Sequence, residues 1–204
     1  MKEKFLLKEY YVLCDGGVCK DFLNENEKRD ISENGAMYLT GIMQRADVKN
    51  GNGRIYPYKT LLREIENYKK IIRENRAIGS LDHEDSPIIS LKTASHKVID
   101  VWWNGKDVMG KIKVLSGNMG PNLRSLVNDG VQIGISSRAL GSLQESREGL
   151  IVEDDLQLIC FDVVSEPSTS GAFMMPKMVN ESLIREQLTK TDILNRAINN
   201  ILYG

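Results

Sequence analysis

The sequence has no hydrophobic run long enough to cross a membrane. Its richest apolar stretch, residues 156–164, is interrupted by Gln157 and Asp162, whereas a membrane span needs about 20 consecutive apolar residues. Aromatic residues are also scarce at 6%, but hydrophobic residues reach 41% over 204 positions. A chain of this length and composition can bury a sizeable core. The sequence therefore predicts one globular protein with no membrane partner.

Metal ligands and cofactor motifs are few as well. The chain has two histidines and three cysteines, and no cysteine pair has the two-residue spacing of a zinc site. The Gly-x-x-x-x-Gly-Lys-Ser/Thr loop that cradles phosphates is missing too. We therefore expect neither a metal nor an organic cofactor. The odd number of cysteines also favours a reducing compartment.

An excess of positive charge is also lacking. The 27 Lys and Arg residues are balanced by 28 Asp and Glu residues, for a formal net charge of −1. Binding to nucleic acid generally requires a concentration of positive charge that neutralises phosphates. The charge balance therefore argues against a nucleic-acid partner.

Short β-rich segments make up much of what is present. The strands expected from alternation and β-branched content are residues 37–43, 96–103, 108–115, 131–137 and one or two within 150–165. Asn-Gly pairs at 50–53 and 104–105 predict turns with positive φ. The two expected strands around Asn104-Gly105, residues 96–103 and 108–115, predict a β-hairpin.

Two helices are expected between these strands. Apolar residues from Tyr58 to Ile72 recur at helical spacing after Pro57, and a shorter helix with Leu123 and Leu126 on its buried face begins near Pro121. Proline is well tolerated at the first position of a helix. The charged stretch 21–33 is interpreted as a surface loop, and residues 177–204 as a polar helical tail.

His83 lies in a polar stretch, Gly79-Ser80-Leu81-Asp82-His83-Glu84-Asp85, which cannot form a buried strand. We therefore expect an accessible imidazole among carboxylates, and such a group suits a general base. The alternative is a solvated loop histidine without a chemical role. The second histidine, His96, begins a strand and is interpreted as structural or as a support for the site.

Two serines follow one another in the expected strand 131–137. Because side chains alternate, Ile133 and Ile135 share one face, Ser136 points to the other face, and Ser137 points to the apolar one. A serine becomes a nucleophile only beside a base that takes its proton. The alternative is a pair of strand-end serines that form turn hydrogen bonds.

Asp162 is a carboxylate inside an apolar strand, Leu158-Ile159-Cys160-Phe161-Asp162-Val163-Val164. Burial of an unpaired carboxylate is costly, so Asp162 needs a partner. The candidates are a histidine and Arg138. An ion pair with a purely structural role is the alternative interpretation.

Five motifs in one order carry a resemblance to a known family. They are Asn50-Gly51-Asn52-Gly53-Arg54-Ile55-Tyr56-Pro57, Leu81-Asp82-His83, Ala94-Ser95-His96, Gly134-Ile135-Ser136-Ser137-Arg138 and Phe161-Asp162-Val163-Val164-Ser165-Glu166-Pro167-Ser168. From residue 37 to 176 the chain resembles the prohead core proteases of large T-even-like tailed bacteriophages. It is more distantly similar to the capsid-assembly serine proteases of herpesviruses.

This resemblance implies an α+β fold with a herpesvirus-protease-like β-barrel core and peripheral helices. It also implies a serine endopeptidase inside the viral prohead, assembled in the host cytoplasm, that digests scaffold and capsid-protein prosegments. His83 matches the base and Ser136 the nucleophile. Herpesvirus enzymes have a second histidine after the serine, and because both histidines here precede Ser136, Asp162 is the expected third member.

The expected supporting residues are Ser137, His96 and Arg138. Arg138 is a candidate donor to the oxyanion, with a backbone N–H as the alternative. The expected assembly is a homo-oligomer. A rival interpretation of the whole chain is a catalytically silent structural or scaffold component with the same barrel.

Self-cleavage is expected near the N-terminus. The family favours cleavage after Glu with an aliphatic residue two positions earlier, and Leu7-Lys8-Glu9 fits that pattern. The predicted organisation is an inhibitory prosegment 1–9 removed between Glu9 and Tyr10, a protease domain 10–176 and a tail 177–204. Glu186 in the tail is a second candidate cleavage point. A three-residue pattern also occurs by chance, as in Leu62-Arg63-Glu64.

Overall fold

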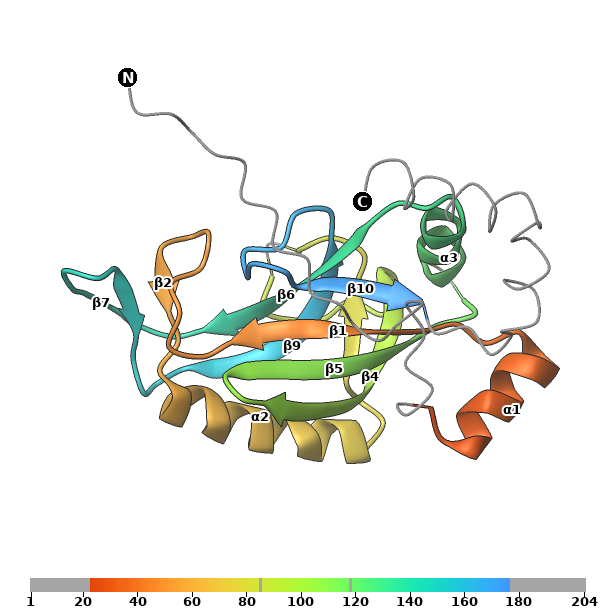
Figure 1. Ribbon diagram of the computed structural model, residues 1–204, viewed down its shortest axis with the longest axis horizontal. Helices are drawn as coiled ribbons and strands as arrows, with labels where there is room; N and C mark the ends of the chain where they lie inside the picture. The colour runs from red at the N-terminus through yellow and green to blue at the C-terminus, as the bar shows by residue number, and fades with distance from the viewer. Residues whose placement is uncertain (1–22, 85, 118, 177–204) are drawn as a thin grey trace, which may run out of the picture. The chain divides into compact units, whose positions relative to one another are not determined.

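A computed structural model describes residues 23–84, 86–117 and 119–176 (Figure 1). The described residues fall into two units, 23–34 and 35–176, and each is treated by itself. The predicted cleavage points at Glu9 and Glu186, together with the predicted prosegment and tail, lie outside the described residues.

A seven-stranded sheet forms the larger unit. Its strands are β1 (Tyr38–Arg45), β3 (Ile78–Ser80), β4 (Ala94–Asn104), β5 (Asp107–Val114), β6 (Ile133–Leu140), β9 (Gln157–Val164) and β10 (Phe173–Pro176). Their order across the sheet is β3-β4-β5-β1-β10-β6-β9, and all neighbours pair antiparallel. The expected hairpin at residues 96–115 is confirmed as β4 and β5.

The two edge strands of this sheet, β3 and β9, meet, so the sheet nearly closes into a barrel. A parallel bridge pairs Leu81 with Val163, and the Asp82 backbone N–H donates to the Val163 carbonyl at 2.8 Å. Closure covers strand edges that would otherwise be left unpaired. The predicted α+β fold, a β-barrel core with peripheral helices, is confirmed.

The predicted long helix is confirmed as α2 (Tyr58–Arg73), which follows Pro57 directly. Its apolar stripe, including Leu61, Ile65 and Tyr68, is buried, and helix α2 contacts β4 and β9. Tyr68 packs edge-on against Phe161, with ring centroids 5.3 Å apart. Each such buried side chain contributes roughly 1.5–3 kcal/mol. This contact fixes the position of β9 at Phe161, and so also that of the next residue, Asp162.

The second helix is α3 (Gly120–Asn128), with a narrower buried face than predicted. Leu123 is fully buried, but Leu126 is 37% exposed. The strand after it also begins later than predicted, because β6 starts at Ile133 and Val131 is 46% exposed. Both differences arise because apolar spacing alone does not show which turns of an element reach the core.

The interpretation of residues 21–33 as a loop is wrong over the described part. Residues 25–34 form helix α1 (Glu25–Asn34). The Glu27 backbone N–H donates to Asn24 Oδ1, and the Asn24 backbone N–H donates to Glu27 Oε2, both at 2.9 Å. This reciprocal pair is a capping box, a helix-start signal that the charged composition obscured.

A small second sheet consists of β2 (Arg54–Ile55), β8 (Leu150–Val152) and β7 (Leu143–Glu145), in that order. The turn before β2 was expected to place two glycines at positive φ, but only Gly53 has it, at +75°. Gly51 instead donates its N–H to the Ser168 carbonyl at 2.7 Å. None of the helices in the described ranges is long and apolar enough to cross a membrane.

Candidate active site

Asp162 is the centre of the candidate site, fully buried in β9. Its Oδ2 accepts hydrogen bonds from His83 Nδ1 at 2.8 Å and Arg138 Nε at 2.9 Å. Its Oδ1 accepts from the Ser80 backbone N–H at 2.9 Å and Arg138 Nη2 at 3.1 Å. The sequence left His83 or Arg138 as alternative partners, and the structure brings both to Asp162.

These hydrogen bonds keep Asp162 charged. Burial alone would raise the pKa of this carboxyl, but hydrogen bonds from His83, the Ser80 N–H and Arg138 outweigh burial and lower the pKa below its usual range. An ionised carboxylate can only accept hydrogen bonds. In the neutral imidazole of His83, Nδ1 therefore carries the proton and Nε2 carries the lone pair. This is the tautomer that a general base needs.

His83 lies in the loop between β3 and β4, where the backbone turns sharply. The preceding residue, Asp82, has a φ of +66°, a left-handed conformation that aspartate tolerates better than most residues. The same residue is tied to the Val163 carbonyl, next to Asp162. As a result the ring of His83 lies against Asp162 while its side chain remains 43% exposed. The predicted accessibility is confirmed.

Ser136 lies opposite Asp162 in the β6–β9 pair. Side chains of directly opposed residues share a face of the sheet, and Arg138, two residues further along β6, reaches Asp162 from that face. Ile135 points to the other face and is fully buried in the core. The predicted face of Ser136 is therefore confirmed.

The predicted strand end at residue 137 is wrong, and Ser136 lies buried within β6. Ser136 is only 7% exposed, and β6 continues to Leu140, which pairs with Gln157 of β9. The hydrogen bonds of the described residues include none between Ser136 and His83, although both are neighbours of Asp162. Such bonds are often long in free enzymes and tighten when substrate binds.

Ser137 belongs to a different polar group on the opposite face of β6. Gln44 Nε2 donates to Ser137 Oγ at 2.9 Å, and Thr169 Oγ1 donates to Gln44 Oε1 at 2.6 Å. This chain links β1, β6 and the segment that follows β9. Ser137 thus holds strands together and does not lie with Asp162.

His96 is fully buried and uses both ring nitrogens. Its Nε2 lies 3.0 Å from the Phe161 carbonyl, which can only accept, so Nε2 donates. The Ser95 hydroxyl then donates to Nδ1 at 2.9 Å. Burial lowers the pKa of His96 to about 4. Gly79 makes this contact possible, since a Cβ there would lie 2.5 Å from Nε2.

The guanidinium of Arg138 has all three nitrogens engaged. Nε and Nη2 bind Asp162, and Nη1 donates to the Ser86 carbonyl at 2.5 Å. These bonds direct the guanidinium toward Asp162 and the loop that carries His83. The predicted oxyanion role of Arg138, with a backbone N–H as the alternative, stays a prediction.

Several members of the site were missed from the sequence. Ser80 binds Asp162 through its backbone, and the Cys160 thiol lies 3.4 Å from Asp162 Oδ1. Glu84 and Thr93 contact one another beside Arg138. Cys160 could have been found, because residues two apart in a strand share a face. The other three come from a loop and a short edge strand without a periodic signal.

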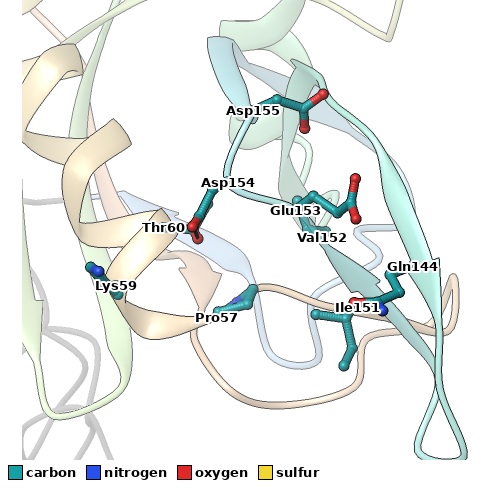
Figure 2. A pocket seen from close by; sticks show the side chains of 9 residues that line it. All are labelled: Pro57, Lys59, Thr60, Gln144, Ile151, Val152, Glu153, Asp154 and Asp155. Carbon is teal, nitrogen blue, oxygen red and sulfur yellow. Dashed lines mark hydrogen bonds between the residues drawn. The ribbon is translucent and has the colours of Figure 1, made fainter.

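A pocket of about 660 Å³ lies away from these residues, beside the start of α2 (Figure 2). Two of its three carboxylates have structural partners: Asp154 accepts from Thr60 Oγ1, and Asp155 accepts from the Ser142 backbone and hydroxyl. None of the predicted site residues lines it. Over residues 23–84, 86–117 and 119–176, no group of three or more His, Cys, Asp or Glu side chains is arranged to hold a metal.

Comparisons with known proteins identify the family of this chain. The family model described as prohead core protein serine protease matches residues 12–184. The prohead core protein protease of Enterobacteria phage T4 is 33% identical over 175 residues, covering 83% of this chain and 82% of that protein. The solved capsid assembly protease of bacteriophage T4 superposes with a TM-score of 0.62 at 32% identity, covering 64% of this chain and 82% of that one. The chain therefore belongs to the prohead core protein serine protease family.

Proposed function

We propose that this prohead protease cleaves peptide bonds with Ser136 as nucleophile, His83 as general base and Asp162 as the residue that orients His83. Family membership supports a protease that acts in capsid maturation. The observation that carries the assignment is the 2.8 Å contact of His83 Nδ1 with Asp162 Oδ2. Asp162 is also the residue directly opposite Ser136 in the β6–β9 pair. The arrangement follows the logic of a serine protease triad.

The proposed reaction has two steps. Ser136 Oγ bonds to the scissile carbonyl carbon while His83 Nε2 takes the hydroxyl proton, and that proton passes to the leaving amine as the C–N bond breaks. Water then attacks the acyl-serine, with His83 taking its proton and returning it to Ser136 Oγ. Asp162 remains ionised throughout and stabilises the imidazolium that forms in each step.

The proposed substrates are the scaffold or core proteins and the major capsid protein of the same phage, cut inside the prohead. The T4 relatives are a prohead core protein protease and a capsid assembly protease, which supports this choice. The active form is proposed to be a homo-oligomer, which sedimentation of the purified protein at several concentrations tests.

Activation is proposed to include removal of residues 1–9 by cleavage between Glu9 and Tyr10, and a second cleavage after Glu186 that detaches the tail. Residues 10–176 would form the protease domain. Intact-mass measurement of wild type and Ser136→Ala during activation tests this. An active wild-type protein that still begins at Met1 would contradict it, as would equal trimming of Ser136→Ala with no other protease present.

A fluorophosphonate probe tests the catalytic assignment. The expected result is one covalent adduct on Ser136, with no adduct in Ser136→Ala and a much slower reaction in His83→Ala. Digestion of the purified scaffold protein by wild type, but not by Ser136→Ala, completes the test. A folded wild-type protein that neither takes the probe nor digests scaffold would favour the structural-component alternative.

A further inference from the structure

Arg138 joins two parts of the site that are distant in sequence. Its side chain is only 10% exposed. Two nitrogens, Nε and Nη2, form a fork on the two oxygens of Asp162. The third nitrogen, Nη1, donates to the carbonyl of Ser86 and lies 3.7 Å from Glu84 Oε2. Ser86 and Glu84 belong to the loop that carries His83.

The same contacts close into a ring around the base of this loop. Glu84 Oε1 accepts a hydrogen bond from the Thr93 hydroxyl, which lies 3.2 Å from the Ser80 hydroxyl. The Ser80 backbone N–H donates to Asp162 Oδ1, and Asp162 binds Arg138. Five residues from β3, the loop, β6 and β9 are thus held in one continuous polar network.

We propose that Arg138 is a positioning residue: it fixes the Asp162 carboxylate and the His83 loop to each other, and thereby sets the orientation of the His83 imidazole. This inference rests on the proposed function of His83 and Asp162. It assigns Arg138 a role in orienting the general base, His83, in place of the predicted role as a donor to the oxyanion.

The need for such a tether follows from where His83 lies. Of the described residues between Ser80 and Ala94, only Leu81 bridges to another strand, at Val163, and a loop with few ladder hydrogen bonds depends largely on local contacts. The His83 ring is partly exposed. Without Arg138, the loop beyond Asp82 would keep only the His83–Asp162 bond and contacts within the loop, such as the one between Glu84 and Thr93. A base displaced by about 1 Å can lose on the order of 100-fold in rate.

Two features of Arg138 can be tested separately: its positive charge beside Asp162, and its simultaneous hydrogen bonds to the carboxylate and the loop. Lysine in place of Arg138 keeps a positive charge near Asp162 but cannot bind two carboxylate oxygens and a loop carbonyl at once. Glutamine removes the charge as well. Arg138→Lys therefore tests the tether, and Arg138→Gln tests the tether and the charge together.

The charge should appear in the pH profile. The titratable groups around Asp162, besides Arg138, are His83 and Glu84 in the loop, Tyr68 on α2, His96 on β4 and Cys160 on β9. Burial raises the pKa of Tyr68 and raises that of Cys160 to about 12, and it lowers that of His96 to about 4, so all three are neutral near pH 7. Arg138 is then the permanent cation beside Asp162.

Steady-state cleavage of a peptide by wild type, Arg138→Lys and Arg138→Gln is the first test. For Arg138→Lys we expect kcat to fall at least about tenfold with KM unchanged. For Arg138→Gln we expect a larger fall, and the acid limb of the kcat profile should move to higher pH because burial then raises the pKa of Asp162. Wild-type kcat and pH profile in both variants would overturn the inference.

Arg45→Lys is the matched control. Arg45 forms a similar fork on Asp107, with Nε 2.5 Å from Oδ1 and Nη2 3.2 Å from Oδ2, on strands β1 and β5. It is part-buried but does not contact His83 or Asp162. A purely structural effect of losing a forked arginine would lower stability in both proteins, whereas only the Arg138 variants should change kcat and the pH profile.

Nitrogen-15 NMR of the histidines gives a second readout that does not depend on catalysis. The chain has two histidines, so a Ser136→Ala protein labelled at histidine shows two imidazoles, and His83→Gln assigns them. We expect the hydrogen-bonded Nδ1–H of His83 to be protected from exchange with Arg138 and to lose that protection in both variants. Unchanged protection would refute the tether even if Ser136→Ala had confirmed the proposed function. Should Arg138→Gln fail to fold, Arg138→Lys decides alone.

Discussion

Replacement of Asp162 by asparagine is expected to remove nearly all activity while changing almost no volume. Oδ2 accepts from two side chains, His83 and Arg138, and Oδ1 accepts from the Ser80 N–H, Arg138 and the Cys160 thiol. An asparagine must put its NH2 group at one of these two places. In either orientation a donor then faces two or three donors.

Both orientations harm catalysis or stability. If the NH2 group faces His83, the ring must turn to the tautomer with its proton on Nε2, which cannot accept the Ser136 proton. By analogy with the triad, the rate then falls by about four orders of magnitude. If the NH2 group faces the Ser80 N–H, the buried Arg138 guanidinium loses its bond from Nη2 to the carboxylate. Breaking a buried ion pair typically costs about 3–5 kcal/mol, a large part of an ordinary folding free energy of about 5–15 kcal/mol.

The measurement has two parts. Urea unfolding of Asp162→Asn in a Ser136→Ala background gives the loss of stability without self-digestion, and peptide cleavage by Asp162→Asn alone gives the loss of rate. Asp107→Asn, which breaks the fork on Arg45 and leaves the bonds of Asp162 in place, controls for a lost ion pair. A folded Asp162→Asn protein that cleaves at a near-normal rate would refute the role of Asp162 and move the orientation of His83 to another group.

Ser136→Ala should abolish peptide cleavage with the fold intact by circular dichroism, whereas Ser137→Ala should stay active and lose about 1–3 kcal/mol in urea unfolding, because Gln44 loses its acceptor; the reverse pattern of activity would contradict the face assignment. His83→Ala should be as inactive as Ser136→Ala, and the double variant no worse, since nucleophile and base act as a unit; additive losses would argue against a pair. Asp82→Val should slow cleavage more than Asp82→Gly, because the φ of +66° suits glycine; equal rates would show that this turn does not position His83. The folded-state pKa of His96 lies at about 4, below its unfolded value near 6.5, so the unfolded chain binds one more proton between these pH values. Unfolding should therefore become easier by on the order of 3 kcal/mol as the pH falls through that window. A His96→Gln protein with the same pH dependence of unfolding would refute this.

The sequence was informative where chemistry or periodicity is local. The long stripe from Tyr58 to Ile72 predicts α2, because helical periodicity over many residues is a strong signal. A carboxylate in an apolar strand predicts that Asp162 has a charged partner, because the cost of its burial does not depend on the fold. Alternation in β6 predicts the face of Ser136. The motif set also predicts the family, which the comparisons confirm.

Short-range signals failed where packing decides the outcome. Val131 and Leu126 are apolar and correctly spaced, yet both are exposed, because spacing along one segment does not show which positions the other segments cover. The capping box of Asn24 and Glu27 was present in the sequence but was outweighed by the charge around it. The burial of Ser136 depends on the length of the β6–β9 pair, which is a property of two segments and not of one.

The identity of the site residues was thus determined by the sequence, and their arrangement by the closure of the barrel. His83 and Asp162 are 79 residues apart, and they meet because β3 closes the sheet against β9 through the bridge between Leu81 and Val163. That closure brings the Ser80 N–H to Asp162 and lets Arg138 bind both the carboxylate and the His83 loop. No local pattern encodes these contacts, because each is made between strands whose pairing is fixed only when the whole sheet has formed.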